Sequence, residues 1–140
     1  MHSDFHRNLV VEPTISGTVA GVTQILGNVV NHEGRLNVLH IVRLGAIVAG
    51  TISTVKVQHG SLANASDFVD VPGLTYTILD TDGFRFVRQE LKRPSKPFSR
   101  VVVTRTTQNV TVEQAWAISN EQRYNPVAAD ATTVSQIVNV

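Results

Sequence analysis

Several common components of folded proteins are absent or scarce in this chain of 140 residues. It has no cysteine, which excludes a disulfide framework, thiolate metal ligands and a cysteine nucleophile. Its 3 lysines and 5 glutamates are too few for the charged surface of a long helical bundle. The longest apolar run, residues 44–52, contains two glycines and falls short of the roughly 18 residues of a membrane-spanning helix. We also expect no signal peptide, because the first residues lack its basic-then-apolar pattern.

β-Branched side chains are what the chain has in abundance. Val (23), Thr (14) and Ile (8) make up 45 of the 140 residues. Because branching at Cβ restricts χ1 and suits a pleated surface, this composition predicts strands. A hydrophobic content of 42% is enough to fill a core, and a formal net charge of +1 gives little self-repulsion. A disordered chain is therefore not expected.

Turn signals divide the chain into strand-like segments at the 8–12-residue spacing that is typical of a β-sandwich or barrel. The expected strands are residues 22–30, 36–44, 51–59, 68–71, 74–79, 84–91, 98–106 and 110–118. Asp82-Gly83 predicts a type I′ hairpin between two of them, and residues 107–109 predict a second hairpin. Residues 36–44 are largely apolar on both faces, which favours a central strand, and we expect Trp116 in the core.

The pattern predicts one β domain, residues 21–119, with two arms. The N-terminal arm, residues 1–20, contains a short extended piece at residues 9–15. The C-terminal arm, residues 120–140, is extended and ends in an apolar segment with strand propensity. Such a strand must pair with its own domain or with the sheet edge of another subunit, and the sequence leaves both possibilities open.

Motifs for catalysis or cofactor binding are missing from the sequence. It contains neither the Gly-x-Ser-x-Gly motif of serine hydrolases nor a glycine-rich phosphate loop. His32, His40 and His59 lack the close spacing of metal ligands, and we interpret them as structural. Asp80-Thr81-Asp82-Gly83 resembles the start of a calcium loop, but Leu91 replaces its closing glutamate. We therefore expect no enzyme, no cofactor and no metal site.

Basic residues concentrate in one stretch. Seven of the twelve lie between residues 85 and 105, where Glu90 is the single acid: Arg85, Arg88, Lys92, Arg93, Lys96, Arg100 and Arg105. This pattern fits a basic rim that meets phosphate or an acidic protein surface. It fits equally well a solvated sheet edge that discourages aggregation, and Pro94 and Pro97 agree with that reading.

Five short motifs carry a family resemblance. They are residues 44–51 (LGAIVAGT), 55–60 (VKVQHG), 68–73 (FVDVPG), 98–103 (FSRVVV) and 123–126 (RYNP). In this order they resemble the auxiliary virion proteins of tailed bacteriophages, most closely the capsid cement (decoration) proteins of short-tailed phages of the Bordetella-phage type. The resemblance covers roughly residues 36–126. The chain departs from the family pattern at His59-Gly60-Ser61, where a Ser-Asp pair is usual, and in its long apolar tail.

The resemblance implies a jelly-roll-like antiparallel β-sandwich without catalytic activity. It further implies a homodimer on the outside of the virion that binds across neighbouring subunits of the major capsid protein, with no membrane and no specific nucleic acid as partner. Two arms on a rigid domain suit this role, because the second contact becomes intramolecular once the first has formed. We expect the contacts to come from the arms and the basic stretch: His6, Arg7, Leu9, Arg85, Arg88, Arg93, Val134, Ile137 and Val138.

Two alternative functions fit the same sequence. One is a carbohydrate- or nucleic-acid-binding β-sandwich module, although one Trp and two Tyr supply few stacking platforms. The other is a head-completion or tail structural protein, which would differ from a shell protein in its copy number per virion.

Overall fold

The computed structural model describes residues 9–120 and the strand at residues 136–139. This part consists of strands and two short 3-10 helices, η1 (Ala65–Asp67) and η2 (Asp80–Asp82). The strands are β1 (Leu9–Ile15), β2 (Ile25–Leu26), β3 (Val30–Asn31), β4 (Asn37–Ile47), β5 (Ser53–Gly60), β6 (Val69–Thr77), β7 (Phe86–Lys92), β8 (Phe98–Arg105), β9 (Val110–Asn120) and β10 (Gln136–Asn139). Neither helix in these ranges has the length and apolar character needed to cross a membrane.

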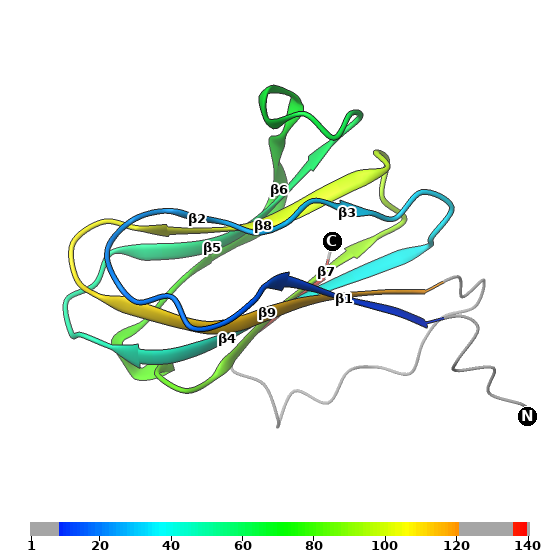
Figure 1. The fold of residues 1–140 in the computed structure, drawn as a ribbon. Helices are drawn as coiled ribbons and strands as arrows, with labels where there is room; N and C mark the ends of the chain where they lie inside the picture. The colour runs from blue at the N-terminus through cyan, green and yellow to red at the C-terminus, as the bar shows by residue number, and fades with distance from the viewer. Residues whose placement is uncertain (1–8, 121–135, 140) are drawn as a thin grey trace, which may run out of the picture.

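The strands form two sheets that face each other as layers (Figure 1). Sheet A has the order β1-β9-β4-β7-β10, and sheet B has the order β2-β8-β5-β6, with β3 also paired to β8. All of these pairings are antiparallel except that of β10 with β7. If β2 and β3 are counted as one interrupted strand, successive strands from β1 to β9 alternate between the two sheets. The one exception is β5 and β6, which follow each other in sheet B. This is the arrangement of a jelly roll, so the expected all-β sandwich is confirmed.

The core lies between the sheets and is filled by alternate residues of the facing strands. In β4, Val38, His40 and Val42 are at most 1% exposed, whereas the residues between them are half-buried. This strand lies between β9 and β7, which confirms the expected central position. Removal of such apolar side chains from water provides the main driving force for folding, roughly 25 cal/mol per Å² of apolar surface.

Both expected hairpins are wrong, because the two connections are corners between sheets. β6 lies in sheet B and β7 in sheet A, and η2 joins them. Gly83 has a φ of −53°, not the positive value of a type I′ turn. β8 and β9 also lie in opposite sheets. Because both strands have apolar inner faces, placing them face to face across the core buries both faces at once.

The N-terminal segment is part of the sandwich and not, as expected, wholly an arm. Residues 9–15 form β1, which pairs with β9 as an edge strand of sheet A. Ile15 is 6% exposed and belongs to the apolar core, so this strand gains its place by burying its inner side. Val19 continues the association through an isolated bridge to Val112. Of the predicted arm at residues 1–20, only residues 1–8 precede the sheet.

Three further boundaries differ from the expectation. β4 continues to Ile47 through the segment expected as a loop. The strand expected at residues 22–30 is reduced to β2 and β3, which flank Gly27. A Cβ at Gly27 would lie 2.8 Å from Cγ1 of Val101, so the chain approaches β8 more closely there than other residues allow. Pro72-Gly73 lies at a register shift within β6, where a bulge removes the proline from the ladder.

A bulge in β9 reverses which of its side chains face the core. The pairing of β9 with β4 skips Glu113. Val112 before the bulge and Ala115 after it are both fully buried. One extra residue inverts the two-residue period of a strand, so Trp116 falls on the outer face of sheet A. The expectation of Trp116 in the core is therefore wrong.

Candidate interaction surface

The outer face of sheet A carries an apolar surface that spans three strands. Strand register aligns its residues in two rows: Pro13, Trp116 and Ile41 form one, and Val11, Ile118 and Leu39 form the other. We call these six residues the apolar outer face. Val11 is 54% exposed, and the residues of β4 and β9 in these rows are half-buried. A one-sided sandwich strand usually presents polar residues to water, so this surface is a candidate for protein contact.

Two arginines lie beside the apolar outer face, and they differ in their partners. Arg43 Nε donates to Glu113 Oε2 at 3.0 Å, and its guanidinium lies 4.8 Å from the ring centroid of Phe86. Arg88 is the register partner of Ile41 and extends the first row onto β7. Its Nε is buried and has no hydrogen-bond partner within the described ranges. Because this nitrogen is enclosed by the chain itself, a binding partner contacts only the remainder of the half-buried Arg88 side chain.

Both terminal segments depart from one corner of sheet A. Leu9, the first residue of β1, and Asn120, the last of β9, are Cα partners in the ladder. Residues 1–8 precede the first of these residues and residues 121–135 follow the second, and in Figure 1 the two chain ends of the described sheet lie side by side. The predicted interface residue Leu9 therefore marks the corner, whereas His6, Arg7 and Val134 lie outside the described residues.

The tail strand β10 occupies the opposite edge of sheet A. It runs parallel to β7, with Ile137 beside Arg88 and Val138 beside Gln89 in register. The structure thus pairs the tail strand with the chain's own sheet, one of the two possibilities that the sequence leaves open. Two of the predicted interface residues, Arg88 and Ile137, are brought together by this pairing.

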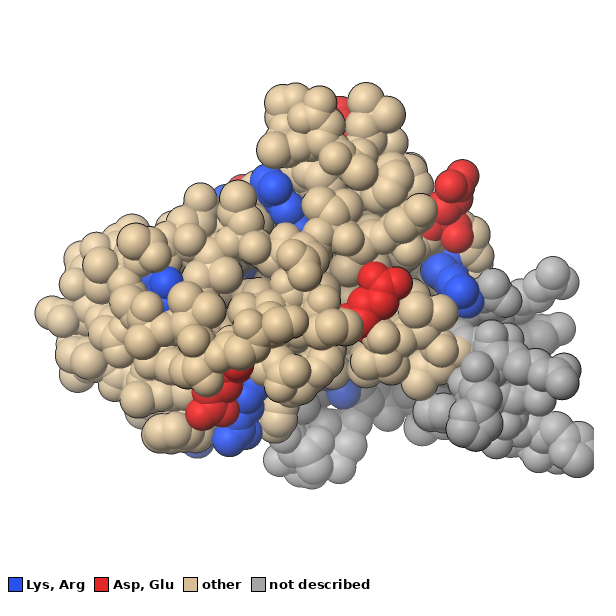
Figure 2. All heavy atoms as spheres, in the orientation of Figure 1, with Lys and Arg blue, Asp and Glu red and all other residues tan. Residues whose placement is uncertain are grey.

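The basic stretch does not form one surface. Arg85 and Arg93 flank the two ends of β7, and only Arg88 between them adjoins the apolar outer face. Arg100 faces outward on sheet B, where it stacks 4.5 Å from the ring centroid of Phe68. Arg105 is 3% exposed and binds backbone carbonyl groups inside the β8–β9 corner. Figure 2 shows isolated charged groups separated by uncharged surface on the face in view, with no continuous basic patch there.

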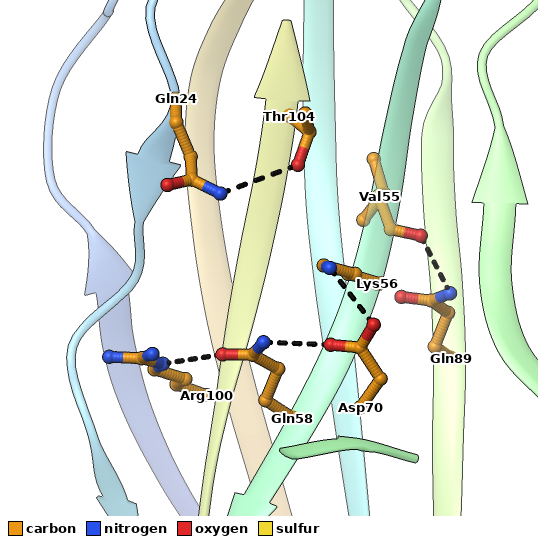
Figure 3. A network of polar contacts seen from close by, with 8 residues as sticks. All are labelled: Gln24, Val55, Lys56, Gln58, Asp70, Gln89, Arg100 and Thr104. Carbon is orange, nitrogen blue, oxygen red and sulfur yellow. Dashed lines mark hydrogen bonds and ion pairs between the residues drawn. The ribbon is translucent and has the colours of Figure 1, made fainter. Parts of the chain in front are cut away.

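The outer face of sheet B carries a polar network in place of an apolar surface (Figure 3). Asp70 accepts from Gln58 Nε2 at 2.7 Å and from Lys56 Nζ at 3.0 Å, and Arg100 Nε donates to Gln58 Oε1 at 3.0 Å. The hydrogen bond from Gln58, followed by that from Lys56, holds the pKa of Asp70 below its ordinary value. These groups, defined here as the sheet B network, bond to one another, which leaves fewer of them available to a sugar.

Three histidines that lie far apart in the sequence meet inside the sandwich. His40 Nε2 lies 2.9 Å from Ser99 Oγ, and Ser99 is the register partner of His59. His32 is coupled electrostatically to both of the other rings, which places it in the same cluster. The sequence gives no signal for this cluster, because its members come from opposite sheets. No group of three His, Asp or Glu residues within the described ranges has the arrangement of a metal site.

The comparisons with known proteins concern the fold. No protein-family profile and no curated protein matches the chain. A structure from Bacillus endospore appendages, described as disulfide-linked pili, is 13% identical over 81% of this chain and 88% of that chain, with a TM-score of 0.48. The infectious bursal disease virus structure is 7% identical over 84% and 33%, with a TM-score of 0.46. The CBM22-1–GH10 modules of Clostridium thermocellum xylanase 10B are 12% identical over 83% and 28%, with a TM-score of 0.42.

These solved structures include a virus, a pilus and an enzyme with an attached module, and all three TM-scores lie below 0.5. The similarities therefore carry no argument about the family or the activity of this chain. The functional conclusion depends on the surfaces described above.

Proposed function

We propose that this chain is a structural virion protein that attaches to the outside of an assembled phage capsid through sheet A and cements neighbouring subunits of the major capsid protein. One observation carries the proposal. The apolar outer face and the corner from which both terminal segments depart belong to the same sheet. Sheet A thus combines an apolar surface with the points at which residues 1–8 join β1 and residues 121–135 follow β9.

The physical advantage of this arrangement is multivalency. Once the apolar outer face is docked, contacts made by residues 1–8 or 121–135 become intramolecular events with a high effective concentration. A protein that binds only the assembled shell stabilises that shell by mass action. Arg88 adds specificity, because its half-buried guanidinium group carries a positive charge beside the apolar outer face and favours a carbonyl or carboxylate acceptor on the capsid subunit.

A non-catalytic role is part of this proposal. The sheet B network contains a single carboxylate, that of Asp70. His40 Nε2 does lie 2.9 Å from Ser99 Oγ, but both side chains are at most 1% exposed between the sheets and His40 Nδ1 has no hydrogen-bond partner within the described residues that would orient the ring, so this pair is supported less well as a nucleophile and its base. A sugar-binding module is supported less well, since the sheet B network is already internally bonded and Phe68 is covered by Arg100.

The experiment that tests the proposal is quantitative mass spectrometry of purified particles of the virus that encodes the chain. We expect hundreds of copies per particle, in a fixed ratio to the major capsid protein. A dozen copies or fewer would assign the chain to the neck or tail, and its absence from particles would overturn a virion role. We further propose that the chain forms a homodimer, as the family resemblance implies, and sedimentation velocity of the purified chain should then show a species of twice the monomer mass.

A further inference from the structure

A polar layer crosses the core between the two sheets. His40 on β4 and Gln89 on β7 are register partners, and both are 1% exposed. His40 Nε2 lies 2.9 Å from Ser99 Oγ on β8. Figure 3 shows the second contact, in which Gln89 Nε2 donates to the carbonyl oxygen of Val55 on β5 at 3.2 Å. Both interactions join sheet A to sheet B through the interior, where they separate two apolar clusters.

Two more histidines adjoin this layer from sheet B and its neighbouring turn. His59 on β5 pairs in register with Ser99. His32 follows β3, is 1% exposed, and its backbone N–H donates to the carbonyl oxygen of Pro97 at 2.9 Å. His32, His40 and His59 thus come from three separate elements, and together we call them the histidine cluster.

The histidine cluster is built for neutral rings. Four of its imidazole nitrogens are buried and have no hydrogen-bond partner: Nδ1 and Nε2 of His32, Nδ1 of His40 and Nδ1 of His59. A protonated imidazole donates from both nitrogens and therefore needs two acceptors. A buried ion that lacks acceptors and a counter-charge is strongly unfavourable. The packing therefore disfavours a charged ring most strongly at His40, which is enclosed between the sheets, and less at His59, which is half-buried, and at His32, which lines a cavity.

The charged groups around the cluster do not supply that counter-charge. His32 lines a cavity of about 260 Å³, and three charged residues, Glu33, Arg35 and Lys96, line the same cavity. Lys96 acts on His59 and lowers its pKa further than burial alone. Asp67 lies near Lys96, and its carboxylate accepts the backbone N–H groups of Ser61 and Leu62. Within the described ranges no ion pair joins a carboxylate to one of the three rings.

We propose that the histidine cluster is an acid-sensitive lock between the sheets, closed while its rings are neutral and released when they are protonated. Release separates sheet A from sheet B around His40 and Ser99, because a protonated His40 ring carries an N–H at the buried Nδ1, which has no acceptor within the described part of the chain. This property is independent of the proposed attachment to a capsid, since it resides in the isolated sandwich.

The direction of the pH effect follows from linkage. Burial lowers the pKa of His40 to about 3. Burial, aided by the nearby His59, also lowers the pKa of His32 below its ordinary value of 6.5, against the opposing effect of hydrogen bonds to the backbone of His32 and Phe98. The unfolded chain therefore binds more protons than the folded chain below pH 6.5, and stability falls as the pH falls. A single imidazole that stays neutral in the folded protein raises the unfolding equilibrium constant about 25-fold between pH 7 and pH 5.

The test is urea unfolding of the full chain at pH 7 and pH 5, followed by circular dichroism. For the wild type we expect an unfolding constant that rises by 25-fold or more over this interval. His32→Gln and His59→Gln keep a polar side chain but remove the titrating ring, so each should reduce the rise. The matched control, Thr54→Gln, changes a side chain on the outer face of the same sheet without adding or removing a titrating group and should leave the rise intact.

Nuclear magnetic resonance of the wild type removes any dependence on how the variants fold. The imidazole C–H resonances of His32 and His40 should stay at their neutral positions down to pH 5 while the chain is folded. Amide exchange at that pH should accelerate first in β4, β5 and β8. Titration of these rings near pH 6.5 together with an unfolding constant that does not change would overturn the proposal.

Discussion

The outer faces of the two sheets differ in chemistry although both belong to one sandwich. On sheet A, six apolar side chains align in two rows, and the adjacent Arg88 has a buried nitrogen without a hydrogen-bond partner within the described ranges. On sheet B, the corresponding surface is a chain of hydrogen bonds from Lys56 to Arg100. The polar groups of the sheet B network form hydrogen bonds with one another. Sheet A instead presents the apolar outer face, with the positive charge of Arg88 beside it.

This difference indicates which face requires a partner. Polar groups that bond to one another and to water gain little from docking, and surface ion pairs contribute little to stability. Apolar rows gain from removal of water in proportion to their area. We therefore expect substitutions on sheet A to change attachment, and substitutions on sheet B to change the stability of the sandwich slightly.

The largest effect is expected for the double variant Ile41→Asp, Ile118→Asp. Each aspartate would carry an unpaired charge into the docked interface, so attachment to shells that lack the protein should weaken at least about 100-fold. Leu26→Asp on sheet B is the matched control, because Leu26 is 52% exposed on that outer face. Cosedimentation with shells measures both variants. Equal loss of attachment in the two would contradict the assignment of the contact to sheet A.

A smaller effect is expected for Arg88→Gln. Loss of a charge-assisted hydrogen bond to the capsid subunit should weaken attachment about 10-fold and reduce its sensitivity to salt. Arg100→Gln removes an arginine of the sheet B network and serves as the comparison. Attachment titrations at two salt concentrations distinguish them. An unchanged affinity for Arg88→Gln would remove this arginine from the interface.

The smallest effect is expected for Asp70→Asn in the sheet B network. Because the pKa of Asp70 is lowered in the folded chain, its ionised form stabilises the fold at neutral pH, and this contribution disappears as the pH falls below about 4. Asp70 is half exposed, so the loss at pH 7 should stay under about 1 kcal/mol. Urea unfolding at pH 7 and pH 3 measures the effect, and unchanged attachment is the second expectation.

The strands themselves were accessible to prediction because their signals are local. β-Branched composition and alternation located β4, β5 and β7 to within a few residues. The corners at residues 80–85 and 106–109 were misassigned as hairpins, because turn residues do not specify whether the next strand pairs beside the last or crosses to the other sheet. That choice depends on the total apolar area buried between the sheets.

The interaction surface was harder to predict than the strands for two physical reasons. The bulge at Glu113 inverts the period of β9 and places Trp116 outside, and no local signal marks an extra residue. The histidine cluster depends on strands of opposite sheets. Among the predicted interface residues, the strands of sheet A contain Leu9, Arg88, Ile137 and Val138, whereas Arg85 and Arg93 lie beyond the ends of β7.

The most direct test of the account is a cryo-electron microscopy map of the intact particle at a resolution that separates strands. The account predicts that sheet A, with the apolar outer face and the corner at Leu9 and Asn120, lies against the capsid, and that the sheet B network faces solvent. A map in which sheet B contacts the shell, or in which sheet A is exposed on every copy, would contradict it.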